Sequence, residues 1–174
     1  ELEWNMNGLA GAYRFLNRLF LLIEDTKEFS EAGEIDHGKR NNEDSEIQKK
    51  LHQTVKKVSE SMEDNFHFNT AIAALMELLN DMTSYRQKVI DTGKISSESK
   101  KIWREVMEKT VLMLSPFAPH IADELWSASG REGYAFLENW PEYIEELTKE
   151  SKINLVGQGN GKSRDTIHSA VNMR

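Results

Sequence analysis

The side chains that commonly perform chemistry in enzymes are present here, but they do not form a recognisable catalytic set. No histidine stands at a metal-ligand spacing from another histidine. Acidic residues are numerous, yet no two of them form a convincing pair inside an apolar pocket. The chain has no cysteine, which excludes a thiolate metal site and a cysteine nucleophile. We therefore expect no catalytic residue and no metal site, and interpret each histidine as structural or solvated. The histidines are His37, His52, His67, His120 and His168.

A glycine-rich stretch near the end of the chain superficially resembles a phosphate-binding loop. It runs from Gly157 to Ser163 and contains Gly161-Lys162-Ser163. The four-residue gap that separates the first glycine from the Gly-Lys-Ser unit in such loops is missing, and no apolar helix follows. A nucleotide site is therefore excluded there, and no cofactor is expected in this chain.

Three groups of basic residues could bind phosphate. Arg14 and Arg18 are four residues apart, so on a helix they share one face. A guanidinium can make two hydrogen bonds to one phosphate, which suits this pair to RNA backbone contacts. For any single cation, a solvated surface charge is the simpler interpretation. The other two groups are Lys100, Lys101 and Arg104, and Lys162 and Arg164.

Composition limits the classes of protein that need to be considered. The chain has 174 residues, 39% hydrophobic and 29% charged, as is ordinary for one soluble domain or one domain with part of a second. The net charge of −7 argues against a general nucleic-acid binder, so any RNA site would have to be a local basic stripe. No signal peptide and no apolar run of membrane-spanning length is visible. The first residue is not methionine, and we expect a piece of a longer protein.

Hydrophobic periodicity predicts an all-α protein built as an antiparallel helical bundle. Asn7 and Asn69 are the expected N-caps of the first and third helices. Residues 26–44 lose the periodicity and predict a mobile connection, with room for a short helix over 27–32. Pro116 and Pro119 predict a kink between the last two helices. The predicted helices span about residues 9–23, 45–63, 69–92, 97–114 and 119–129.

The last part of the chain has a different character. Residues 131–152 are irregular and acidic, and two short strands, 153–158 and 162–168, are predicted on either side of Asn160-Gly161. Asn-Gly is the strongest two-residue signal for a β-hairpin, because both residues tolerate positive φ. We therefore predict two units. Residues 1–130 form the bundle, and residues 131–174 form an irregular segment with a small β-hairpin, the truncated start of a C-terminal α/β subdomain.

Several stretches resemble the anticodon-binding domain of leucyl-tRNA synthetases, which are class I aminoacyl-tRNA synthetases. Residues 68–80, Phe-Asn-Thr-Ala-Ile-Ala-Ala-Leu-Met-Glu-Leu-Leu-Asn, are the most specific match, and isoleucyl and valyl relatives carry different residues there. The kinked helix at 114–126 is similar to one shared more loosely across the class. The remaining matches are Trp4 with Gly8, residues 11–19, Trp140-Pro141 and Asn160-Gly161-Lys162.

The resemblance implies a function that this chain serves for a larger enzyme. Full-length members activate leucine with ATP and Mg²⁺ and transfer it to tRNA. The His-Ile-Gly-His-type and Lys-Met-Ser-Lys-Ser-type signatures of their nucleotide-binding fold are not in this sequence. The bundle is expected to brace tRNA(Leu) and direct its acceptor end to the catalytic domain of the same chain. The expected tRNA contacts are Arg14, Arg18, Lys162 and Arg164, in a cytoplasmic monomer.

The sequence departs from the family in the hairpin. Gly159 stands where a second valine is usual, and Ser163 stands in place of an apolar residue. Both changes weaken strand pairing. A second function remains open, because the acidic charge also fits a helical protein-protein interaction module that holds a partner helix in an apolar groove without binding RNA.

Overall fold

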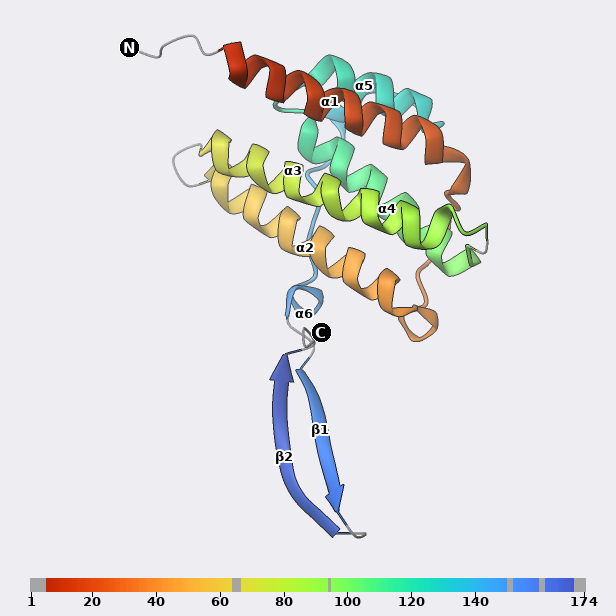
Figure 1. Ribbon diagram of the computed structural model, residues 1–174. Coiled ribbons are helices and arrows are strands. Elements are labelled where there is room, and N and C mark those ends of the chain that lie inside the picture. Colours follow the sequence, from red (N-terminus) through yellow and green to blue (C-terminus); the bar gives the residue numbers. More distant parts are fainter. Residues whose placement is uncertain (1–5, 64–66, 94, 150–151, 160–161, 171–174) are drawn as a thin grey trace.

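The computed structural model describes residues 6–63, 67–93, 95–149, 152–159 and 162–170, with side chains described between residues 8 and 149. Six α-helices and two strands make up the described elements, together with short 3-10 or π turns (Figure 1). The prediction of a helical protein is confirmed. The α-helices are α1 (Met6–Thr26), α2 (Asn42–Glu63), α3 (Phe68–Tyr85), α4 (Ser97–Leu114), α5 (Pro119–Ala128) and α6 (Glu145–Thr148). The shorter turns are η1 (Lys27–Phe29), η2 (His37–Lys39), η3 (Arg86–Ile90) and η4 (Ala135–Leu137).

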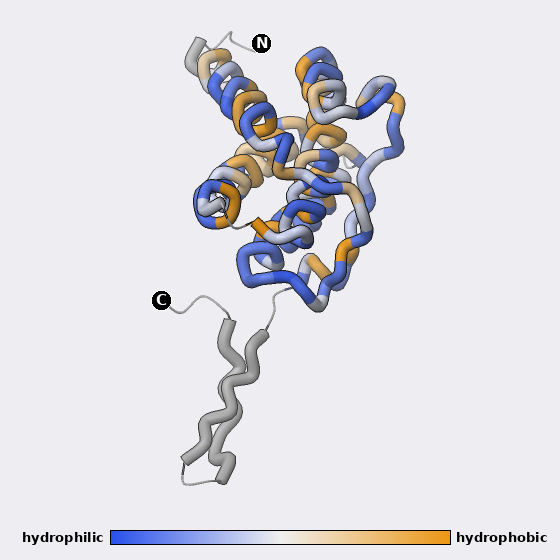
Figure 2. The backbone as a smooth tube through the Cα atoms, turned by 90° about the vertical axis from the view of Figure 1, so that its right-hand side faces the viewer, coloured by the Kyte–Doolittle hydropathy of each residue, from blue (hydrophilic) through white to orange (hydrophobic). Residues whose placement is uncertain are grey.

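The long helices pack around one core. α2 lies beside α3 and also contacts α4, while α5 turns back and contacts both α4 and α1 (Figure 1). Hydrophobic and hydrophilic residues alternate along each helix, as expected of helices that bury one face and expose the other (Figure 2). The largest fully buried side chain is Trp103 on α4. Apolar burial on this scale supplies most of the stability of a helical bundle, because helical propensity alone contributes little.

Two predicted helix caps are wrong. α1 begins at Met6, so Asn7 lies inside the helix and does not precede it. The N-cap of α3 is His67, whose side chain makes no capping hydrogen bond, and Asn69 lies in the first turn. α4 has the expected bounds, and Ser96 caps it by accepting a hydrogen bond from the Ser99 backbone N–H at 3.0 Å. Helix periodicity therefore located the helices better than it located their first residues.

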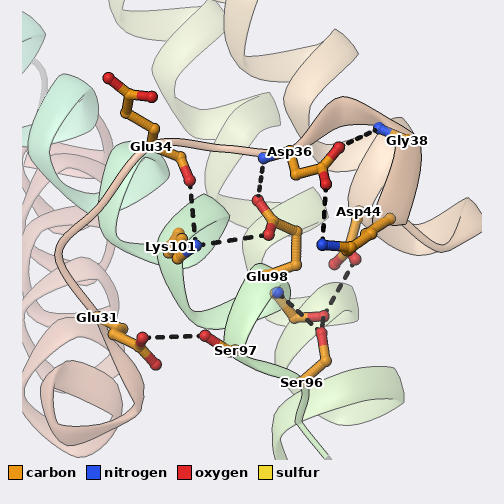
Figure 3. A network of polar contacts seen from close by, with 11 residues as sticks. Glu31, Glu34, Asp36, Gly38, Asp44, Ser96, Ser97, Glu98 and Lys101 are labelled. Atoms are coloured by element: carbon orange, nitrogen blue, oxygen red, sulfur yellow. Dashed lines mark hydrogen bonds and ion pairs between the residues drawn. The ribbon is translucent and has the colours of Figure 1, made fainter.

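The segment between α1 and α2 is fastened to α4, although its sequence predicts a mobile connection. The Glu31 backbone N–H donates to the Lys100 carbonyl at 3.3 Å, and the Asp36 N–H donates to Glu98 at 2.6 Å. Lys101 donates to the Glu34 carbonyl at 3.1 Å, as Figure 3 shows. Two side chains and one backbone carbonyl of α4 thus replace the regular backbone bonds that an aperiodic segment lacks.

A chain of side-chain contacts, which we call the helix junction, joins α1, α4, α3 and α2. The Trp103 indole N–H on α4 donates to Thr26 Oγ1 on α1 at 3.1 Å, and the Trp103 ring stacks on Tyr85 of α3 at 5.4 Å between centroids. The Tyr85 hydroxyl donates to Asp44 of α2 at 2.6 Å. Ser99 of α4 also donates to the Asp44 carboxylate, at 3.0 Å. Asp44 is fully buried, so these donors replace the water that its charge would otherwise need.

Residues 139–149, which we call the strap, cross the outer face of α2 and α4. The Trp140 indole donates to Ser59 at 2.7 Å, and Gln53 donates to the Thr148 carbonyl at 2.9 Å. Between them, the Ile144 backbone N–H donates to Nδ1 of His52 at 3.1 Å. Lys56 forms an ion pair with Glu145 of α6 at 3.1 Å.

β1 (Lys152–Gly159) follows the strap and pairs antiparallel with β2 (Lys162–Ala170). The register runs from Lys152 opposite Ala170 to Gly159 opposite Lys162, with an irregularity between Gly157 and Gln158. The expected turn residues, Asn160 and Gly161, lie outside the described residues.

Replacing Tyr85 with phenylalanine tests the helix junction. Tyr85→Phe removes one of the donors to the buried Asp44 carboxylate and is expected to lower the free energy of unfolding by about 1–3 kcal/mol. Urea denaturation measures the change. Tyr134→Phe is the matched control, because Tyr134 is exposed, and it should leave the urea midpoint unchanged. Equal midpoints for Tyr85→Phe and the unsubstituted chain would contradict the assigned role of the hydroxyl.

The environment of His52 predicts a pH dependence of stability. Burial, with Lys109 nearby, lowers the pKa of His52 from 6.5 to about 4, so the unfolded chain binds more protons between these values. The contribution of neutral His52 to the free energy of unfolding should be fully present well above pH 6.5 and should be lost as the pH falls toward 4. Between pH 7.5 and pH 5 the free energy of unfolding should fall by about 2 kcal/mol. Urea unfolding at the two pH values measures this loss. His52→Asn should reduce it and His120→Asn should not, and an equal loss in all three proteins would refute the assignment.

Candidate nucleic-acid interface

The outer face of α1 carries the first predicted pair of cations. Arg14 and Arg18 are both exposed, while Phe15, Leu19 and Ile23 of the same helix point into the core. This separation follows from the helical period, which places residues four apart on one face. The structure therefore presents the pair to solvent on a rigid helix, as a phosphate contact requires.

The two arginines differ in their local contacts. Arg18 donates from Nη2 to the Asn80 side-chain oxygen at 3.1 Å, which links α1 to α3. A guanidinium has five N–H donors, so this bond leaves others available. Within the part of the chain that the structure describes, no carboxylate forms an ion pair with Arg14 or Arg18. Both cations are therefore available to an external anion.

Asn80 is a part of this face that the sequence analysis did not identify. Asn80 lies 62 positions from Arg18, and no local pattern links the two residues. Tyr13 precedes Arg14 and is 69% exposed, which leaves its ring accessible to a partner. It lies about a quarter turn around the helix from Arg14, so it is exposed beside the arginine face and not on it.

The second basic group is largely occupied within the protein. Lys101 lies 3.6 Å from Glu98, and Arg104 donates to Glu108 at 2.7 Å. Arg131 shares the Glu108 carboxylate, and its guanidinium carbon lies 5.3 Å from the centre of the Trp126 ring. These cations line the groove beside residues 32–37, and their partners neutralise much of its positive charge. The group is better explained as a scaffold for the fastened segment than as an anion site.

The third basic group lies on β2. Lys162 is the first residue of the strand, opposite Gly159, and Arg164 follows it at the irregularity in the register. Their side chains lie outside the part of the chain whose side chains are described. Contact of this pair with RNA stays a prediction.

Metal-binding clusters and membrane-spanning helices are both absent from the described residues. No group of three or more His, Asp or Glu side chains is placed there to hold a metal ion. Within the same residues, no helix combines the length and the apolar character that a membrane span requires.

Comparison with known proteins places the chain in a family. The family described as the anticodon-binding domain of tRNA ligase matches residues 44–173, from α2 through β2. The chain belongs to this family. The match crosses the predicted boundary at residue 130 and leaves out α1, which carries Arg14 and Arg18.

Relatives of this anticodon-binding domain extend the likeness to α1. A leucine–tRNA ligase of Fusobacterium nucleatum is 44% identical over 172 residues, which cover 98% of this chain and 20% of the relative. One from Fervidobacterium nodosum is 40% identical over 176 residues, covering 96% of this chain and 20% of the relative. The chain thus spans about a fifth of the curated relatives it matches.

A solved structure shows the same fold. The ternary complex of Agrobacterium radiobacter K84 agnB2 LeuRS with tRNA and LeuAMS superposes with a TM-score of 0.72 at 33% identity. The likeness covers 99% of this chain and 21% of that one. That LeuRS was solved with tRNA present. The part of it that resembles this chain is about a fifth of its length.

Arg14 forms no ion pair among the described residues, so its replacement is expected to have a small effect on stability. Arg14→Ala should change the free energy of unfolding by less than about 0.5 kcal/mol, because no ion pair is lost. Arg86→Ala removes ion pairs to Asp25 and Asp91 and should cost up to about 1 kcal/mol. Thermal unfolding of both variants measures the difference. A larger cost for Arg14→Ala than for Arg86→Ala would show that Arg14 has a structural partner.

Proposed function

We propose that this chain is the tRNA-binding domain of a leucine–tRNA ligase and that it positions tRNA(Leu) for a catalytic domain elsewhere in the same protein. The supporting observation is the likeness of the whole chain, at 33% identity and a TM-score of 0.72, to part of a LeuRS solved with tRNA. Family membership favours tRNA binding over a helical protein-interaction module, because the family is described by its role in tRNA ligases.

The proposal divides the work between this domain and its parent protein. The ligation of leucine to tRNA, with ATP and Mg²⁺ as cofactors, belongs to the parent, a cytoplasmic enzyme that acts as a monomer. This chain supplies no catalytic residue. Its task is orientation, which accelerates a reaction by holding two reactants in a productive arrangement.

The proposed tRNA contacts are the cations on two parts of the chain. Arg14 and Arg18 lie exposed on α1 and are free of carboxylate partners among the described residues, so they can bind backbone phosphates without breaking an ion pair. Lys162 and Arg164 extend the contact to the hairpin. Phosphate contacts fix the register of a protein on RNA and carry no base information, which suits a domain whose task is orientation.

The domain division follows from the same proposal. Residues 1–130 form the anticodon-binding bundle of the class Ia type, and residues 131–174 lead into a C-terminal α/β subdomain of which the hairpin is the start. The strap belongs to the second unit by sequence, but it packs on the first. In this proposal the helical bundle supplies the first RNA-binding surface, and the hairpin that follows it along the chain supplies a second, smaller one.

Removing the arginine pair tests the proposed tRNA contact. The Arg14→Ala/Arg18→Ala variant should bind tRNA(Leu) at least roughly ten-fold more weakly, because charge-assisted hydrogen bonds to phosphate are lost. The slope of log affinity against log salt should fall in magnitude by about 2, one unit for each contact removed. Filter binding at several salt concentrations measures both quantities.

A matched control removes the same charge elsewhere. The Lys27→Ala/Lys39→Ala variant also lowers the net charge by two, but these lysines already pair with Glu24 and Asp36. It should leave the salt slope within about half a unit of that of the unsubstituted protein. Equal losses in the two variants would mean that overall charge, and not the face of α1, governs binding, and would refute the site.

A further inference from the structure

Side-chain bridges of two kinds join α1 to α3, which run in the same direction (Figure 1). Near the end of α1, Asp25 accepts a hydrogen bond from the Arg86 guanidinium at 3.0 Å, so a carboxylate and a cation neutralise each other. Earlier on α1, Arg18 donates from Nη2 to the Asn80 side-chain oxygen at 3.1 Å. The second bridge holds a guanidinium with a neutral amide, and it therefore leaves the charge of Arg18 without a counter-charge.

The acidic residues beside Asn80 on α3 pair with a different helix. Lys50 of α2 lies 3.1 Å from the Glu77 carboxylate and 3.7 Å from that of Asp81. The hydrogen bond from Lys50 holds the pKa of Glu77 below its usual value, as expected of a carboxylate that a cation stabilises. At this turn, α3 therefore presents carboxylates to α2 and an amide to α1.

An amide partner has two consequences for Arg18. The hydrogen bond at Nη2 restrains a long side chain that would otherwise sample many rotamers, and an ordered side chain loses less freedom when a ligand binds. The other N–H groups of the guanidinium can still form a two-bond contact with a phosphate. A carboxylate in the place of the amide would restrain the side chain equally well, but it would compete with the phosphate for the positive charge.

We propose that Asn80 is a positioning residue for the anion contact of Arg18, because its side-chain oxygen orients the guanidinium from α3 without neutralising it. This inference rests on the proposed function, since the anion is taken to be a backbone phosphate of tRNA. The effect of Asn80 on binding passes through Arg18. Two properties of position 80 then matter for affinity, the presence of an acceptor and the absence of a negative charge.

Two substitutions of Asn80 separate these properties. Asn80→Ala removes the acceptor and leaves Arg18 charged but unrestrained. Asn80→Asp keeps an oxygen acceptor on a side chain of the same shape and turns the bridge into an ion pair. The matched control is Asn139→Asp, which makes the same change from amide to acid at an exposed residue outside α1 and α3. All variants are made in the full chain.

Filter binding of tRNA(Leu) at several salt concentrations gives the affinity and its salt slope. Asn80→Ala should bind about three-fold more weakly, because Arg18 must then be ordered on binding, and its slope should stay within about half a unit of the original. Asn80→Asp should bind at least roughly five-fold more weakly and lose about one unit of slope, because the charge of Arg18 is already compensated. Asn139→Asp should keep the affinity within about two-fold and the slope within about half a unit.

A double substitution tests whether Asn80 acts through Arg18. In an Arg18→Ala background, Asn80→Ala should have no further effect on affinity, because the side chain that it orients is gone. A further loss in that background would show that Asn80 acts independently of Arg18 and would overturn the inference.

Urea unfolding separates positioning from a structural role. Asn80→Asp keeps the bridge between α1 and α3, so its free energy of unfolding should equal or exceed that of the unsubstituted chain. If Asn80 only joined the two helices, Asn80→Asp would keep the tRNA affinity, and Asn80→Ala would lose affinity only as far as it lost stability. Either of these results would overturn the inference.

Failure of the inference can be told apart from failure of the proposed function. Unchanged affinity in both Asn80 variants, with weaker binding by Arg14→Ala/Arg18→Ala, would refute the positioning role and leave the function standing. A loss in Asn80→Asp no greater than that in Asn80→Ala, at an unchanged salt slope, would show that the charge of the acceptor does not matter and would also refute it. An unsubstituted chain that does not bind tRNA would remove the function and the inference together, before any substitution is made.

Discussion

A buried carboxylate is the constraint on which the arrangement of the helices depends. Asp44 begins the core face of α2, has no exposed surface and accepts hydrogen bonds from Tyr85 and Ser99. Burying a charge is costly unless it is fully hydrogen-bonded, so α3 and α4 must approach α2 with these donors in place. Tyr85 stacks on Trp103, and Trp103 donates to Thr26 at the end of α1. One polar network therefore joins four helices and adds to the apolar packing between them.

The two surfaces that matter for the proposed function follow from this junction. With α1 fixed against α3, Arg18 comes within hydrogen-bond distance of Asn80, while Arg14 stays free. With α2 fixed against α4, His52 and Lys109 flank one path across the surface, and the strap occupies it. The face of α1 that carries Arg14 and Arg18 and the path of the strap are thus set by the same core, although they lie on different helices.

An acidic protein can still present unpaired cations to an external anion when its charges are arranged in this way. The net charge is −7, yet most of the described cations in ion pairs lie away from the outer face of α1. Lys101 and Arg104 resemble a basic patch in the sequence, but their charge is used to hold residues 31–36 and the groove beside them. Net charge is therefore a poor guide to anion binding by this protein, because an anion binds to the cations that have no ion-pair partner.

The sequence by itself determined the helices, the exposed pair on α1 and the resemblance to its family. These depend on local order: a period of 3.6 residues puts Arg14 and Arg18 on one face whatever the rest of the chain does. It could not locate the first residues of α1 and α3, because caps depend on few atoms. The sequence wrongly predicted mobility for residues 26–44. The hydrogen bonds that hold this segment go to α4, some 60 positions away, and no local pattern reveals them. Only the tertiary structure decided that Asn80 holds Arg18, that Lys101 and Arg104 are occupied, and that His52 meets Ile144 across 92 positions. Such contacts follow from packing and from the need to satisfy buried polar groups, and neither leaves a periodic trace in the sequence.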